Sequence, residues 1–140
     1  MTDSYESALR QRNRGFVSRM LPAIAYTGTI FYGGLIRLAK LPETGFVASD
    51  KLLHALAFGG LALLLVRAMR WLRPTRTLHW QLIAAGSGAS LLGLLLELCQ
   101  ACLSYRSADV WDWVADTVGA ALALGLAFGW LHLTPGRARG

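Results

Sequence analysis

The chain has 140 residues, of which 54% are hydrophobic and 16% are charged, and its mean hydropathy is +0.42. A soluble domain of this length would not need several apolar runs long enough to cross a bilayer. The composition therefore predicts a single membrane domain over residues 1–140. The formal net charge is +6, but the basic residues stand at the ends of the apolar runs. We interpret them as topology signals and expect no nucleic-acid partner.

The first element is a polar arm over residues 1–16, which has no apolar periodicity and carries Arg10, Arg12 and Arg14. We expect it to be cytoplasmic, with a short surface helix as an option. Residues 17–36 form the first apolar run, close to the roughly 20 residues that a bilayer requires. A cleaved signal peptide is the alternative, but the run is long for that role and no small-residue cleavage site follows it. An uncleaved membrane span is predicted here.

Three more spans are expected, over residues 52–66, 78 to about 103, and 110 to about 131. Residues 37–50 contain Pro42 and Gly45, which predict a loop. Between the second and third spans lies a strongly basic hairpin with four arginines, Arg67, Arg70, Arg73 and Arg76. Residues 104–107 predict a turn, and residues 132–140 form a tail.

The distribution of basic residues predicts the topology. If the N-terminus is cytoplasmic, the arm, Arg19 near the start of the first span, the basic hairpin and the tail place ten of the fourteen Lys and Arg residues on the cytoplasmic side. This asymmetry satisfies the positive-inside rule. We therefore predict an all-α membrane protein, a four-transmembrane-helix bundle with both termini inside.

Polar residues gather where spans two to four meet the outer face. The second span begins with Asp50, Lys51 and His54, the third ends with Glu97 and Gln100, and Arg106, Asp109, Asp112 and Asp116 follow. At about 100° per residue each helix can turn these side chains to one side. Because isolated charges in hydrocarbon are costly, they are expected to meet in a polar cluster at the outer end of the bundle.

Three motifs occur in order along the chain: D-K-x-x-H (Asp50, Lys51, His54), E-x-x-Q (Glu97, Gln100) and R-x(5)-D-x-x-x-N-T-x-G (Arg106, Asp112, Asp116, Thr117, Gly119). Over about residues 46–130 they resemble the VanZ-like family of small multi-pass membrane proteins. Asp116 stands where that pattern usually has Asn. The resemblance implies a role in the bacterial cell envelope at the plasma membrane, and the family is linked to teicoplanin resistance.

The predicted ligand-binding residues are Asp50, Lys51, His54, Glu97, Gln100, Arg106, Asp109, Asp112, Asp116 and Thr117. A guanidinium such as that of Arg106 recognises phosphate or carboxylate, although a salt bridge to Asp109 or Asp112 is an open alternative. Glu97 could instead pair with Lys51 or Arg106 and only fix helix packing.

Three functions stay open. The first is binding of membrane lipids or a lipid-linked envelope precursor in an outward-facing polar pocket. The second is an intramembrane enzyme that acts on such a lipid, with Glu97, His54 and Asp112 as candidate acid–base groups. The third is a small proton-coupled transporter, for which four short spans would require a homo-oligomer.

Neither a metal nor a cofactor is predicted. A divalent cation in the polar cluster would find oxygen and nitrogen ligands, but the spacing identifies no metal. Cys99 and Cys102 form a C-x-x-C within a span, which favours small packing residues over a disulfide.

Overall fold

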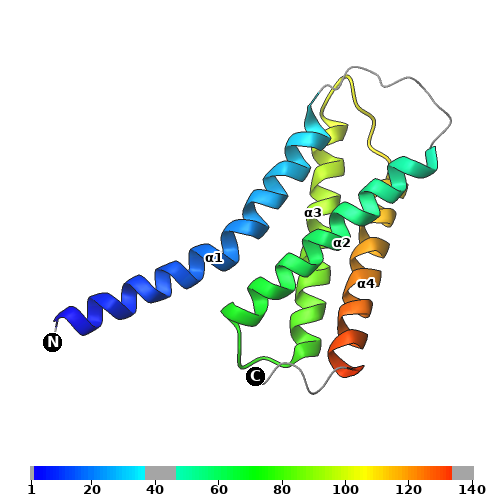
Figure 1. Ribbon diagram of the computed structural model, residues 1–140. Coiled ribbons are helices and arrows are strands. Elements are labelled where there is room, and N and C mark those ends of the chain that lie inside the picture. The colour runs from blue at the N-terminus through cyan, green and yellow to red at the C-terminus, as the bar shows by residue number, and fades with distance from the viewer. Residues whose placement is uncertain (1, 37–46, 134–140) are drawn as a thin grey trace.

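The computed structural model describes residues 2–36 and 47–133 and contains four helices, with no strand among these residues. They are α1 (Thr2–Leu35), α2 (Val47–Leu72), α3 (Leu78–Ala101) and α4 (Val110–Leu133). Figure 1 shows α2, α3 and α4 side by side, while α1 approaches them obliquely and its N-terminal half extends away. The predicted all-α class and the four helices are confirmed. The tail lies almost wholly outside the described residues.

Helix α2 is longer than predicted at both ends. Residues 47–50 were expected in a loop, and Arg67 and Arg70 in the basic hairpin, yet both segments belong to α2. The prediction was wrong because residues 46–52 and 66–73 contain no Gly or Pro that would end a helix. Pro74 is the first strong helix breaker after the apolar run. Asp50 in the first turn and Arg70 in the last also match the helix dipole.

Helices α3 and α4 begin and end close to the predicted residues. The Thr77 hydroxyl accepts a hydrogen bond from the Trp80 amide at 3.3 Å and caps the N-terminus of α3. The Gln81 side chain donates to the carbonyl oxygens of Arg73 at 2.9 Å and Arg76 at 3.1 Å. The loop between α2 and α3 is therefore held by its own polar contacts.

Three helices in the described part of the chain are long and apolar enough to cross a membrane, over Asp50–Leu72, Leu78–Ala101 and Val110–Trp130. The first predicted span, over residues 17–36, is not among them. Its apolar residues are interrupted by Arg19, Pro22 and several hydroxyl side chains. Thr27 and Thr29 bond back to the carbonyls of Ala23 and Ala25 within α1, at 2.8 and 3.0 Å.

The C-terminal half of α1 nevertheless runs along most of the bundle. At one end the ring of Phe16 packs edge-on against Trp71 near the end of α2, with centroids 5.8 Å apart. At the other end Tyr105, after α3, donates to the carbonyl of Leu35 at 2.8 Å. Residues 16–35 would extend about 30 Å at 1.5 Å per residue, which is the thickness of a bilayer core.

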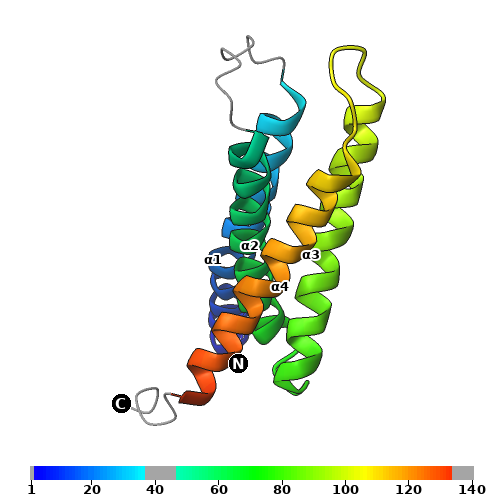
Figure 2. The ribbon, with the colours of Figure 1, turned by 90° about the vertical axis from the view of Figure 1, so that its right-hand side faces the viewer.

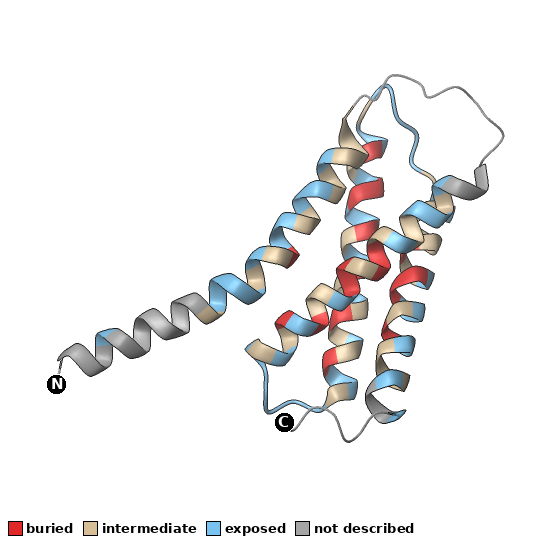
Figure 3. Ribbon diagram, viewed as in Figure 1, coloured by how far each residue is buried: buried red, intermediate tan, exposed pale blue. Residues whose placement is uncertain are grey.

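The tightest packing joins α2 and α4, which have the most extensive contact of any helix pair described. A Cβ on Gly119 would overlap the backbone of Ala55, so only glycine permits this crossing. Phe58, Leu61 and Leu96 are fully buried between the helices. Figure 3 shows the buried residues facing inward and exposed ones facing out, and the latter include large leucines, as expected for a surface that contacts lipid.

Candidate functional site

The beginning of α2, the end of α3 and the beginning of α4 lie at the same end of the bundle (Figures 1 and 2). Six side chains from these segments are joined by hydrogen bonds or ion pairs, and we call them the carboxylate–histidine network. Its members are Lys51, His54, Glu97, Asp109, Asp112 and Asp116. All six were among the predicted ligand-binding residues.

Lys51 on α2 holds two aspartates at the start of α4. Its Nζ atom lies 2.9 Å from Asp109 Oδ2 and 2.8 Å from Asp112 Oδ1. The Lys51 side chain is 35% exposed and that of Asp112 only 13%. Partial burial strengthens such a pair relative to one on an open surface. The contact fixes the register between α2 and α4.

His54, one turn after Lys51, contacts a third aspartate on α4, Asp116, and lies near Asp112. Its Nδ1 atom lies 2.9 Å from Oδ1 of Asp116, whose side chain is completely buried. When Asp116 is ionised its carboxylate can only accept, so Nδ1 then carries the ring proton. Nε2 lies 3.8 Å from Asp112 Oδ2, which is too far for a direct hydrogen bond. The second ring nitrogen is thereby left as a potential base or ligand.

Glu97 on α3 is 5% exposed and accepts a hydrogen bond from the Asp109 backbone amide at 2.8 Å. The pairing with Lys51 or Arg106 considered for Glu97 is not formed, because Lys51 is taken by the aspartates of α4. Among the described residues, Glu97 Oε1 and Asp116 Oδ2 are buried with no hydrogen-bond partner. Carboxyl groups are therefore concentrated at this end of the bundle, and two of them are incompletely hydrogen-bonded.

Asp109 combines two roles. Its Oδ1 atom accepts from the Trp111 amide at 2.9 Å and caps α4, while Oδ2 bonds Lys51. The Lys51 ammonium, followed by the Trp111 amide, holds the pKa of the Asp109 carboxyl below its usual range. Asp109 is thus the N-terminal cap of α4.

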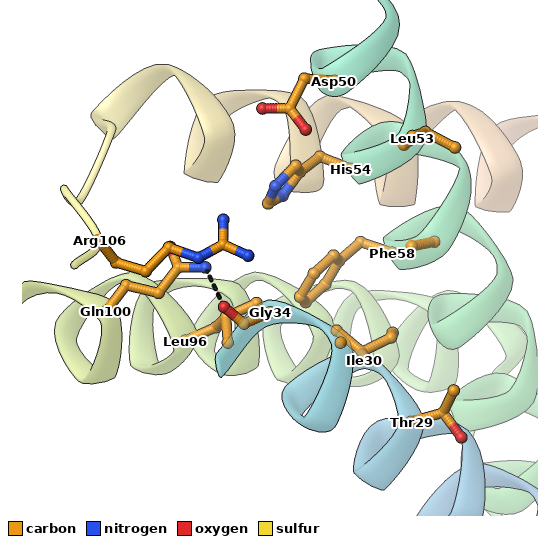
Figure 4. A pocket seen from close by; sticks show the side chains of 12 residues that line it. Thr29, Ile30, Gly34, Asp50, Leu53, His54, Phe58, Leu96, Gln100 and Arg106 are labelled. Atoms are coloured by element: carbon orange, nitrogen blue, oxygen red, sulfur yellow. Dashed lines mark hydrogen bonds between the residues drawn. The ribbon is translucent and has the colours of Figure 1, made fainter. Parts of the chain in front are cut away.

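A cavity of about 340 Å³ opens beside this network, between α1, α2 and α3. Figure 4 shows His54, Asp50, Gln100 and Arg106 toward one side of it. The rest of the lining is largely apolar and includes Ile30, Leu53, Phe58 and Leu96. The cavity therefore offers charged groups and a hydrocarbon-like wall within one space.

Arg106 reaches this cavity from the loop before α4 (Figure 4). The salt bridge to Asp109 or Asp112, left open by the sequence, is not formed, and Lys51 is the cation that pairs with both aspartates. Within the part of the chain that the structure describes, the Arg106 side chain makes no ion pair. Its guanidinium can therefore meet an anion without first breaking such a pair.

Gln100 was predicted to bind ligand, and its side chain both lines the cavity and joins α3 to α1. Its Nε2 atom donates to the carbonyl of Gly34 at 3.0 Å (Figure 4). Together with Tyr105 it binds carbonyls at the end of α1 that have no partner within the helix. The motif spacing gave no sign of this role, because the approach of α1 depends on long-range packing.

Comparison with models of known protein families identifies the family: the VanZ/LLP1 model matches residues 6–132. This chain belongs to the VanZ/LLP1 family. No curated protein and no solved structure matches it.

Two motif residues of this VanZ/LLP1 chain, Thr117 and Gly119, belong neither to the carboxylate–histidine network nor to the cavity lining. The Thr117 hydroxyl donates to the Trp113 carbonyl at 3.0 Å and lies 2.8 Å from Ser90 Oγ. The Trp113 indole donates to the Ser90 carbonyl at 3.1 Å. Thr117 and Gly119 thus serve contacts between helices, and Thr117, although predicted to bind ligand, does not line the cavity.

The two cysteines of the VanZ/LLP1 chain are both free. Cys99 is half-buried on α3, whereas Cys102 is exposed and its amide closes the C-terminus of that helix. No disulfide joins them, and half-burial of Cys99 is compatible with the packing interpretation, whereas the exposed Cys102 does not fit it.

Proposed function

We propose that this chain is an integral membrane protein of the bacterial plasma membrane that binds the anionic headgroup of a lipid or lipid-linked envelope precursor. The single observation that carries the proposal is the position of Arg106. Its guanidinium borders a cavity that Asp50 also lines, and Lys51, not Arg106, is the cation that pairs with Asp109 and Asp112. A phosphate or carboxylate would be its natural partner, since guanidinium binds both through paired hydrogen bonds.

The lining of the cavity favours an amphiphile over a small soluble anion. Phe58 and Leu96 are almost completely buried and, with Ile30, provide an apolar wall next to the charged groups. The volume of about 340 Å³ lies at the lower end of the range for small-molecule sites, about 300–1,000 Å³. It fits a headgroup and the first carbons of a chain better than a whole lipid.

We place the cavity on the outer side of the membrane, with both termini inside. The positive-inside rule supports this orientation through the arginines between α2 and α3 and those of the tail. For both termini to be inside, the C-terminal half of α1 must be a fourth span. Its course along the bundle between Phe16 and Leu35 is consistent with that. An envelope precursor exposed on the outer leaflet would then reach the site directly.

Binding can be tested with purified protein in nanodiscs of zwitterionic lipid doped with an anionic phospholipid or an undecaprenyl-phosphate lipid. We expect native mass spectrometry to detect one retained anionic lipid per chain, and Arg106→Ala to lose most of this retention. Arg73→Ala is the matched control, since Arg73 is an exposed arginine in the loop at the opposite end of the bundle. Equal retention by wild type and Arg106→Ala would overturn the proposal. A link to glycopeptide resistance would appear as altered teicoplanin susceptibility of cells that express the wild type but not the Arg106 variant.

An enzyme acting on the same amphiphile is a second candidate, and the His54–Asp116 contact favours it. A buried carboxylate that orients an imidazole is a common way to prepare a general base. Incubation with labelled anionic lipids followed by mass spectrometry separates the two functions. A chemically altered lipid that requires His54 would indicate an enzyme, and recovery of unaltered lipid would indicate a binding protein.

A further inference from the structure

The side chains of His54 and Asp112, which belong to the carboxylate–histidine network, form a cluster with Asp50 at the edge of the cavity. One potential ligand atom from each lies within 4.8 Å of the other two. Asp50 and His54 are on consecutive turns of α2 and line the cavity, as Figure 4 shows, while Asp112 comes from the first turn of α4. We propose that these three residues bind a divalent first-row transition metal ion.

The contacts of His54 are those of a metal ligand. Metal-bound histidines commonly donate their other ring N–H to a carboxylate, which fixes the ring and its tautomer. Asp116 supplies such a carboxylate to Nδ1 at 2.9 Å and is completely buried. The Nε2 atom, which faces Asp112, is therefore the nitrogen that would coordinate.

The separation between His54 and Asp112 also fits. The 3.8 Å between Nε2 and Asp112 Oδ2 is too long for a hydrogen bond. Two atoms that each bind one metal at about 2.1 Å can lie at most about 4.2 Å apart. Lys51 engages the other oxygen, Oδ1, at 2.8 Å, so both contacts of Asp112 are compatible. Asp50 is exposed, and a rotation of its side chain can close the remaining gap.

The charge balance is a second, independent line of support. Five carboxyl groups lie at this end of the bundle, those of Asp50, Glu97, Asp109, Asp112 and Asp116. Among the described residues nearby, the permanently charged cations are Lys51 and Arg106. Asp116 is 0% exposed and Glu97 5%, and each has one oxygen with no hydrogen-bond donor among the described residues. Such a buried carboxyl group is costly to ionise, and a dication bound nearby would lower that cost.

The ligand types narrow the choice of metal. One imidazole and two carboxylates suit Mn²⁺, Fe²⁺ or Zn²⁺ better than Mg²⁺ or Ca²⁺, which prefer oxygen ligands alone. Three protein ligands leave further coordination positions open toward the cavity. The ion would thus stand opposite Arg106, and an anionic headgroup could interact with both. The metal site does not depend on the proposed lipid binding, because its ligands all come from the chain.

The competing interpretation is that His54 is an imidazolium paired with the two aspartates, which needs no metal. Purified full-length protein in lipid-free detergent, titrated with Mn²⁺ alone, distinguishes the two. We expect depletion of the free-Mn²⁺ electron paramagnetic resonance signal to reveal about one bound ion per chain. His54→Ala and Asp112→Asn should weaken binding at least tenfold. The matched control His79→Ala, at an exposed histidine near the start of α3, should bind like the wild type.

A spectroscopic readout on the wild type removes any dependence on how the variants fold. Electron spin echo modulation of the bound Mn²⁺ should show coupling to an imidazole nitrogen, and this coupling should persist in His79→Ala. Absence of stoichiometric binding, absence of nitrogen coupling, or equal loss of binding in His54→Ala and His79→Ala would each overturn the proposal. Because no lipid is present, these outcomes are separate from those of the lipid-binding experiment.

Discussion

His54 and Asp116 face each other across α2 and α4 with 2.9 Å between Nδ1 and Oδ1, immediately beside the place where the two helices touch through their backbones. Ala55 follows His54 in the chain, and Gly119 lies one turn after Asp116 on α4. The same close approach that brings Gly119 against Ala55 therefore allows the side-chain contact. Packing and the candidate site are coupled at this level.

Gly119→Ala should be destabilising. The added Cβ would overlap the Ala55 backbone, which cannot move as a side chain can, so we expect a loss of about 1–3 kcal/mol in unfolding free energy. Gly125→Ala on the same helix is the control, because a Cβ there meets nothing within 4 Å. That variant should be unchanged or slightly more stable, since Ala favours helix over Gly. Unfolding in detergent measures both, and equal stability would contradict the crossing described here.

Gly93→Ala should disturb Asp116 without touching His54 directly. A Cβ at this position would lie 2.6 Å from Asp116 Oδ2, so the carboxylate must shift. Loss of a partner that orients a metal-bound histidine costs about 10–100-fold in affinity, and we expect Mn²⁺ binding to weaken by that order. Gly88→Ala is the control, with its nearest contact an ordinary 3.6 Å to Leu65 Cδ1. Identical Mn²⁺ titrations of the two variants would speak against an orienting role for Asp116.

Gln100→Leu should loosen the end of α1. The substitution removes the donor to the half-buried Gly34 carbonyl, for which we expect a loss at the lower end of the roughly 1–3 kcal/mol that an unsatisfied buried group costs. We expect faster hydrogen exchange in peptides covering residues 28–36, measured by mass spectrometry in detergent. Peptides from α4 should keep their exchange rates, and a uniform acceleration in both regions would indicate global destabilisation instead.

The pH dependence of stability should include a contribution from Asp109. Its pKa is lowered in the folded chain by Lys51 and the Trp111 amide, relative to about 3.9 for an unfolded aspartate. The stabilisation is therefore fully present above about pH 4 and is lost as the pH falls through the lower folded-state pKa. Asp109→Asn keeps a capping side chain but cannot ionise. The difference in unfolding temperature between wild type and Asp109→Asn should shrink on acidification from about pH 6 to 3, and a constant difference would exclude this contribution.

Topology can be checked with single cysteines in a variant lacking Cys99 and Cys102. A membrane-impermeant maleimide added to intact cells or spheroplasts should label Ser107→Cys, in the loop before α4. Thr75→Cys, in the loop between α2 and α3, should react only after the membrane is permeabilised. Labelling of position 75 from outside would reverse the proposed orientation and place the cavity on the cytoplasmic side.

The helices were predictable because their signals are local. Apolar runs bounded by Thr77, the turn at residues 104–107 and the Pro74 loop identify α3 and α4 almost to the residue. The start of α2 at Val47 was missed because polar residues such as Asp50 indicate a loop when the sequence is considered alone. The neighbouring helix that such residues contact is not visible in the sequence. For α1 the sequence predicted a membrane span, but its hydroxyl side chains lower the hydropathy of this helix, and it is not among the three helices of the described residues that are apolar enough to cross a membrane. Its crossing of the membrane stays a prediction.

The residues of the candidate site were also readable, but their pairing was not. Helical periodicity places Asp50 and His54 on one side of α2, and topology brings the ends of α2, α3 and α4 together. The pairing of Lys51 with Asp109 and Asp112 depends on the separation and tilt of helices far apart in the sequence. The same is true of the contact between Gln100 and α1. Their role in binding a ligand stays a prediction until the experiments above are done.

The contact between Gly119 and Ala55 has a consequence for how sequences of this kind can diverge. The spacing of α2 and α4 is defined by main-chain atoms, so the outward leucines can be exchanged for other oily residues without altering the geometry around His54. Saturation mutagenesis should accordingly find that most substitutions are tolerated at the exposed positions and that almost none are tolerated at Gly119.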